Sequence, residues 1–193
     1  AFGFPFDYKV SRFEEAIQIL HGLLREGKVD FIGKYHQARE CELSPRGPRP
    51  QGPPILMGTV QPRMMSCMAK YGDLWNAYYD DTHNKVGGIK RLRPLVDDAC
   101  IKEGRDPGTL ERTVTVLVAD STADPWWDRL PTDNWVEEGP LVPLSGEPQQ
   151  IAECLLEYQE EGISHLQICL EPTTVKTIES FAVVLEFVDK YSN

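Results

Sequence analysis

The stretch that determines the fold is PPILMGTVQPRMMSCMAKYGDLWN, residues 53–76. It predicts a short buried strand, a glycine turn, one amphipathic helix and a second strand. The apolar run from Ile55 to Met57 is too short for a helix and follows two prolines. Pro62 suits the first turn of a helix, where its missing N–H group costs nothing. Methionines recur at helical spacing after it, and Gly72 is typical of a helix end.

The turn after the first of these strands has the features of an anion site. Gly58 lets the backbone turn sharply and come close to a ligand. Thr59 offers a hydroxyl group, and the free N–H groups at the start of the next helix attract an anion such as a phosphate. Arg63 adds positive charge. The alternative interpretation is structural, with Gly58 only joining a strand to a helix.

The rest of the chain alternates strands with helices. A helix is expected over residues 11–26, starting in a capping box formed by Ser11 and Glu14. A hairpin turn is expected at residues 32–36, and an extended proline-rich connector at residues 45–54. Four strand–helix units then follow. Their strands are expected at residues 55–57, 74–79, 113–119 and 165–170, and their helices from residues 62, 82, 148 and 174.

Strands that alternate with helices predict right-handed crossovers and a parallel sheet. The strand at residues 113–119 is nearly continuous in its hydrophobicity, which predicts burial on both faces. Pro94 is expected to kink or split the helix over residues 82–103, and Asp80 and Asp81 to cap the start of that helix. Residues 120–146 are expected to form a loop insertion.

Composition and charge exclude several classes of protein. The chain has 193 residues, of which 41% are hydrophobic and 26% charged, as in ordinary globular proteins. Its net charge of -10 argues against a nucleic-acid or anionic-membrane partner. No apolar run is long enough to span a membrane, and the N-terminus has no secretory pattern, so a cytoplasmic location is expected. The four histidines are isolated, so no metal site is expected.

The same central segment carries a family resemblance. Pro-Pro-Ile-Leu-Met-Gly, followed by Ala-Lys-Tyr-Gly-Asp-Leu-Trp-Asn, resembles the luciferase-like oxidoreductases that depend on a flavin or a deazaflavin. That family has two glycines after the strand, and Thr59 stands at the second position here. Met68 and Leu74 also depart from its usual alanine and glycine. The resemblance covers residues 11 to about 162.

This resemblance implies a (β/α)8 TIM barrel, of which residues 1–193 form a single domain with only the C-terminal half, strands five to eight. A complete domain of that kind needs about 250 residues. Either the chain is a fragment, or a partner supplies the other half. Two free strand edges and an uncovered apolar sheet face would otherwise favour association, so a homo-oligomer is expected.

By resemblance, Gly58, Thr59, Val60, Gln61 and Arg63 bind the phosphate or ribityl part of FMN or of the deazaflavin coenzyme F420. The cofactor would supply monooxygenation or hydride transfer on a small organic substrate. Family residues that touch the ring lie mainly in the other half, so no catalytic residue is predicted. Two alternatives remain, a silent flavin-binding or dimerising relative and a barrel hydrolase without a redox cofactor.

Two further groups of residues are candidates for ligand contact. Asn76 is placed to hydrogen-bond a ligand, whereas Trp75 is expected in the core. Trp126, Trp127 and Trp135 either cover an apolar substrate or form an oligomer interface.

Overall fold

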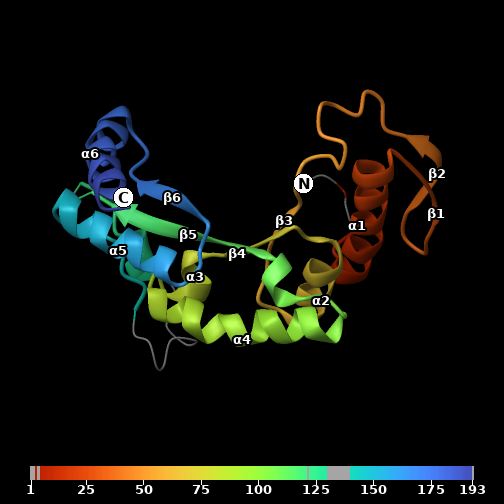
Figure 1. The fold of residues 1–193 in the computed structure, drawn as a ribbon, viewed down its shortest axis with the longest axis horizontal. Coiled ribbons are helices and arrows are strands. Elements are labelled where there is room, and N and C mark those ends of the chain that lie inside the picture. Colours follow the sequence, from red (N-terminus) through yellow and green to blue (C-terminus); the bar gives the residue numbers. More distant parts are fainter. Residues whose placement is uncertain (1–2, 4, 121, 130–139, 193) are drawn as a thin grey trace.

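The centre of the molecule is a sheet of four parallel strands (Figure 1). The structure is a computed structural model that describes residues 3, 5–120, 122–129 and 140–192. The strands lie in the order β3, β4, β5, β6, and their bounds are Leu56–Gly58, Leu74–Ala77, Glu111–Ala119 and His165–Glu171. All four lie within two residues of the predicted strands, and their parallel arrangement confirms the α/β fold. Their carboxyl ends therefore meet at one edge of the sheet.

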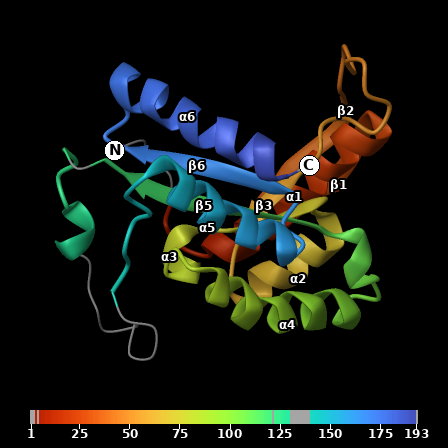
Figure 2. The ribbon, with the colours of Figure 1, turned by 60° about the vertical axis from the view of Figure 1, so that its left-hand side comes forward.

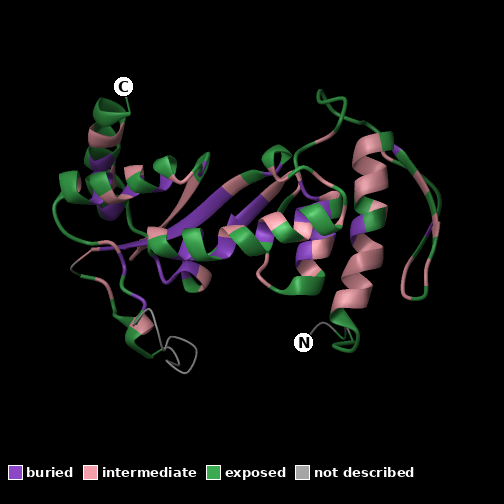
Figure 3. Ribbon diagram, turned by 60° about the horizontal axis from the view of Figure 1, so that its bottom comes forward, coloured by how far each residue is buried: buried purple, intermediate pink, exposed green. Residues whose placement is uncertain are grey.

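Helices cover one face of this sheet (Figure 2). They are α2, α4, α5 and α6, and their bounds are Pro62–Tyr71, Val86–Lys102, Pro148–Glu160 and Val175–Tyr191. Val114, Val116 and Val118 of β5 point into this layer and belong to the main core with Trp75. Figure 3 shows the buried residues concentrated on these strands and on the inward sides of the helices. The repeated strand–helix pattern thus produces one two-layer core.

The N-terminal part lies beside β3. It consists of α1, Lys9–Glu26, and an antiparallel hairpin of β1, Lys28–Ile32, and β2, Gln37–Glu42 (Figure 1). The hairpin is confirmed, but the predicted capping box of Ser11 and Glu14 at the start of α1 is wrong. The helix begins earlier, after Tyr8 in a left-handed conformation, and no side chain caps it. Ser11 and Glu14 instead contact Arg63 of α2.

The predicted helix over residues 82–103 is divided, though not at its proline. A short helix α3, Tyr79–Thr82, is followed by α4, which runs through Pro94. The division occurs where His83 and Asn84 adopt positive φ angles of 54° and 57°. Pro94 is exposed, so water can reach the helix around it. Asp80 and Asp81 lie inside α3, so they do not cap the long helix as predicted. Asp81 instead accepts a hydrogen bond from the Tyr78 amide at the start of α3, at 3.4 Å.

The described parts of the segment after β5 contain regular structure that the sequence does not predict. A short 3-10 helix, η2, spans Trp126–Arg129, and Leu144 forms a parallel bridge with Val118. The amide of Ala119 donates to the carbonyl oxygen of Leu144 at 2.9 Å. This returning segment thereby extends the sheet beside β5 beyond the end of β4. Trp135, from the predicted group of three tryptophans, lies outside the described residues.

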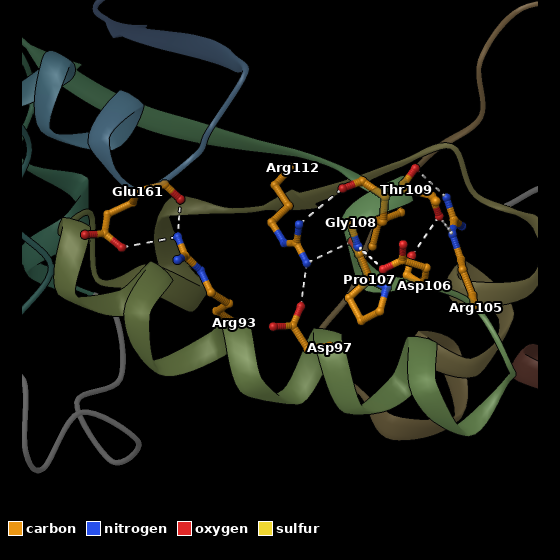
Figure 4. A network of polar contacts seen from close by, with 10 residues as sticks. Arg93, Asp97, Arg105, Asp106, Pro107, Gly108, Thr109, Arg112 and Glu161 are labelled. Atoms are coloured by element: carbon orange, nitrogen blue, oxygen red, sulfur yellow. Dashed lines mark hydrogen bonds and ion pairs between the residues drawn. The ribbon is translucent and has the colours of Figure 1, made fainter.

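Arginines bind the amino ends of the strands to the helices (Figure 4). A 3-10 helix, η1, Pro107–Thr109, joins α4 to β5. Arg112 at the start of β5 pairs with Asp97 of α4, and Arg93 pairs with Glu161 after α5 at 3.2 Å. Arg105 donates to the carbonyl oxygen of Gly72 at 2.6 Å. Because polar contacts at this edge are far from the carboxyl ends, their role is structural.

Candidate functional site

Gly58 is the last residue of β3 and lies exposed at the carboxyl edge of the sheet. Its φ angle is not positive, unlike those of seven other described glycines. A Cβ atom built on it would meet only the carbonyl oxygen of Asn76, at 3.6 Å, which is an ordinary contact. The fold itself therefore does not require glycine here. What glycine provides is open space beside the backbone.

The turn from Thr59 to Gln61 is held by two hydrogen bonds. The indole Nε1 of buried Trp75 donates to the carbonyl oxygen of Thr59 at 2.8 Å. The amide of Gln61 donates to the Thr59 hydroxyl oxygen at 3.2 Å, which leaves the hydroxyl proton free to be donated to a ligand. Half-buried Val60 packs on the core. The turn is thus fixed from beneath while its outer side stays accessible.

Helix α2 begins directly after this turn with the features of an anion site. Gln61 precedes the helix in an extended conformation, no side chain caps the helix start, and Pro62 occupies the first turn. Uncapped N–H groups at a helix start attract negative charge. The predicted strand, glycine turn and helix start are therefore all present in the order expected.

Arg63 is directed away from this role by an ion pair. Its Nε atom donates to Glu14 at 2.6 Å, and its Nη2 atom donates to Ser11 at 2.8 Å and also to Glu14. The hydrogen bond that Arg63 donates to Glu14 holds the pKa of Arg63 above its ordinary value. Arg63 therefore joins α1 to α2, and Glu14 neutralises its charge.

The sheet face opposite the helices is polar, which corrects the expected apolar face. Asn76 of β4 donates to Thr115 at 3.0 Å and accepts from Thr113 at 2.8 Å, both on β5. Thr115 in turn donates to Gln167 of β6 at 3.2 Å. The Asn76 side chain, predicted to contact a ligand, is thus engaged within the sheet. This row of side chains, Asn76, Thr113, Thr115 and Gln167, is called the polar ladder below.

Aromatic rings gather at the carboxyl ends of β4 and β5. Tyr78 directly follows β4, and its ring lies 4.0 Å from that of Tyr79. Trp126 lies 6.4 Å from Tyr79, and Trp127 lies 5.7 Å from Trp126, as measured between ring centroids. We call Tyr78, Tyr79, Trp126 and Trp127 the aromatic wall. The sequence indicates its tryptophans, but it predicts Tyr78 and Tyr79 as the end of a strand.

Carboxylates surround the aromatic wall. Asp80 and Asp81 follow its tyrosines, and Glu171 ends β6. Burial raises the pKa of both Asp80 and Asp81. The indole Nε1 of Trp126 donates to Glu171 at 3.3 Å. The wall is therefore apolar on its ring faces and negatively charged at its edge.

Cysteine, histidine and acidic residues form no metal-binding group of three or more within the described parts of the chain. Across those same parts, no helix is both long enough and apolar enough to cross a membrane. All five cysteines are free, and Cys67 and Cys100 are buried.

Solved structures define the class of this fold. An F420-dependent secondary alcohol dehydrogenase, solved with an F420–acetone adduct, is 16% identical to this chain with a TM-score of 0.68. The match covers 96% of this chain and 64% of the dehydrogenase chain. The EDTA monooxygenase EmoA from Chelativorans sp. BNC1 is 15% identical with a TM-score of 0.67, over 98% of this chain and 60% of its own. The chain thus has the α/β fold of luciferase-like TIM-barrel enzymes, with a parallel sheet.

The sequence then identifies the family. Residues 1–132 match the luciferase-like monooxygenase family, and the chain belongs to it. The pyrimidine monooxygenase RutA of Allorhizobium ampelinum is 30% identical over 108 residues, which are 56% of this chain and 28% of that protein. RutA of Enterobacter cloacae is 28% identical over 129 residues, 64% of this chain and 34% of that protein. This chain therefore matches only about a third of the length of these curated relatives.

Proposed function

We propose that this chain is part of an oxidoreductase that uses FMN or coenzyme F420 to act on a small organic substrate. Its family membership and the names of its relatives support an enzyme of this type. The bound cofactor would supply monooxygenation or hydride transfer. The chain would bind the anionic tail of the cofactor, orient it and exclude water from it.

The open space beside Gly58 is the observation that carries this proposal. Neither backbone conformation nor crowding explains glycine at this position. Close approach of a ligand to the backbone does explain it, because any side chain would occupy that space. Thr59 adds a hydroxyl donor, and Val60 and Gln61 lead into the uncapped helix start. These residues fit an anionic tail by their chemistry. Arg63 contributes less, because it is paired with Glu14.

The chain would provide strands five to eight of a (β/α)8 barrel as one domain over residues 1–193. Support comes from the four parallel strands, in which no other described strand pairs with the outer edges of β3 and β6. The polar ladder would then face the barrel interior. A further part of the same protein, a second copy of this chain or another polypeptide would supply the remaining strands.

Cofactor binding tests the proposal directly. FMN and F420 are titrated separately against the purified protein, and the cofactor fluorescence is followed. Gly58→Val is expected to weaken binding at least about 10-fold, or ~1.4 kcal/mol, and to change unfolding free energy by less than about 0.5 kcal/mol. Gly87→Ala is the control, because a Cβ there meets no atom within 4 Å. Equal affinity in the Gly58→Val variant and the control would refute the site.

One alternative is a relative that binds cofactor without catalysis. It would show the flavin absorption spectrum but no turnover with any reductant and oxygen. Measurable substrate-dependent oxidation would exclude it.

A further inference from the structure

We propose that the aromatic wall binds a flat, uncharged aromatic molecule, which deepens the proposed function by naming the class of its substrate. The four rings come from two segments far apart in the chain, Tyr78–Tyr79 after β4 and Trp126–Trp127 after β5. Behind the rings, buried Leu117 and Leu141 complete the hydrophobic cluster. Buried side chains thus support Tyr79, Trp126 and Trp127 from behind.

The accessibility of the rings indicates a binding role. Tyr78 is 41% exposed, and both tryptophans are half-buried, whereas Tyr79 is only 6% exposed and supports them. Large exposed aromatic side chains lose contact with water when they stack on another ring. Among the described residues, Tyr78, Trp126 and Trp127 keep part of their surface in contact with water. A flat aromatic partner would supply it.

The polar edge of the wall defines where a hydroxyl or carbonyl group of the ligand would bind. The Tyr78 hydroxyl donates to the Tyr79 hydroxyl at 2.7 Å. The Tyr79 proton is then available for an acceptor, and burial raises the pKa of Tyr79, so it stays protonated. The pair therefore favours a ligand with one hydrogen-bonding group on an otherwise apolar ring.

Carboxylates around the wall disfavour anionic ligands, although the cations Arg91 and Lys176 lie near Asp81 and Asp120. Asp80 and Asp81 lie next to the two tyrosines, and Glu171 accepts from Trp126. Asp120 lies at the end of β5, where hydrogen bonds from Thr122 lower its pKa and keep it ionised. Arg129 is paired with Asp124 at 2.7 Å. A carboxylate on the ligand would thus face repulsion.

Three probes of similar size test each part of this inference. They are 2-naphthol, its saturated counterpart trans-2-decalol, and the anion 2-naphthoate. Binding is followed through the indole N–H signals of the 15N-labelled protein, assigned with single Trp→Phe variants. We expect 2-naphthol to bind roughly 2- to 10-fold more tightly than trans-2-decalol, the range that aromatic stacking supplies, and 2-naphthoate to bind more weakly than 2-naphthol. The Trp126 and Trp127 signals should shift while the Trp75 signal stays constant.

Variants distinguish stacking from general hydrophobic contact. Trp126→Leu keeps apolar bulk and should remove the preference for 2-naphthol over trans-2-decalol. Tyr191→Leu is the matched control, because Tyr191 is an exposed aromatic residue of α6. This variant should keep the preference for 2-naphthol. Should Trp126→Leu fail to fold, the three-probe comparison in the wild type still decides the question. Equal affinity for the flat and saturated probes would overturn the inference.

Titration of FMN and of F420 on the same sample separates this inference from the proposed function. Preference for the flat probe without binding of either cofactor would support the aromatic wall as a ring site and would refute the cofactor site. Cofactor binding without a preference for the flat probe would support the cofactor site and refute the aromatic wall as a ring site. If FMN displaces 2-naphthol and shifts the same indole signals, the wall holds the cofactor ring, and the substrate assignment is wrong.

Discussion

Trp75 and Thr59 are joined by a hydrogen bond of 2.8 Å from the indole nitrogen to the carbonyl oxygen. Trp75 is completely buried in β4, whereas Thr59 lies in the turn after β3. A residue of the core thereby fixes the position of the turn proposed to bind the cofactor tail. Core packing and ligand geometry are coupled at this bond.

Removing this bond should loosen the turn. Trp75→Phe keeps an aromatic ring but lacks the indole donor, so the Thr59 carbonyl oxygen loses its partner. We expect a loss of about 1–3 kcal/mol in unfolding free energy. Urea unfolding measures it, and faster hydrogen exchange at Val60 should accompany it. Trp127→Phe, in a half-buried position, is the control, and an equal loss in both variants would contradict the role of the bond.

Two adjacent glycines in α4 should respond oppositely to alanine. A Cβ on Gly88 would lie 2.4 Å from the carbonyl oxygen of Thr82, whereas a Cβ on Gly87 meets nothing within 4 Å. Gly88→Ala forces α3 and α4 apart and should cost about 1–3 kcal/mol or more. Gly87→Ala should be neutral or stabilise by up to about 1 kcal/mol. Thermal unfolding of both variants tests the prediction, which fails if Gly88→Ala is as stable as the wild type.

Tyr158 of α5 should tolerate loss of its hydroxyl group. The residue is 1% exposed, and its hydroxyl oxygen has no hydrogen-bond partner among the described residues. Tyr158→Phe removes an unsatisfied polar atom and should leave the protein equally or more stable. Tyr158→Ala should cost about 3–5 kcal/mol, because it leaves a cavity. Denaturant unfolding separates the two, and a large loss in Tyr158→Phe would mean that the hydroxyl has a partner.

Glu103 should make stability depend on pH. It accepts from Ser66 and pairs with Lys70 at 3.1 Å, and these contacts hold its pKa below its ordinary value. Because the pKa of Glu103 is lower in the folded state, its contribution to the unfolding free energy is complete above the pKa of the unfolded state. That contribution is lost as pH falls through the pKa of the folded state. Glu103→Gln should therefore destabilise at pH 7 but much less near pH ~3.

Urea unfolding of the wild type and the Glu103→Gln variant at both pH values measures this effect. Glu186→Gln, at an exposed position of α6, is the control and should change stability little at either pH. A loss in Glu103→Gln that is equal at both pH values would show that the carboxylate charge is not responsible.

Local patterns in the sequence predicted the parallel sheet and the turn. The run before Gly58, the proline at position 62 and the glycine at position 72 each act on their immediate neighbours, so a strand, turn and helix followed from them. The four strands were found for the same reason. Pro94 misled the prediction because the break in the helix depends on Asn84, whose amide pairs with the backbone of Leu117, a contact distant in sequence.

The polar face of the sheet was visible in the sequence but was read as apolar. Thr113 and Thr115 alternate with valines along β5, and threonine has nearly the shape of valine, so the strand looked uniformly hydrophobic. Period-2 alternation would have separated the two faces. The pairing of Arg63 with Glu14, by contrast, joins residues 49 positions apart, and no local pattern indicates it.

The arginine contacts at the amino ends of the strands have a consequence for how such a protein can evolve. Arg93, Arg105 and Arg112 hold the scaffold together at the edge opposite Gly58 and the aromatic wall. Loops at the carboxyl edge can therefore accumulate mutations without unfolding the domain. Laboratory selection for new substrates should accept diversity after β4 and β5 far more readily than at these three arginines.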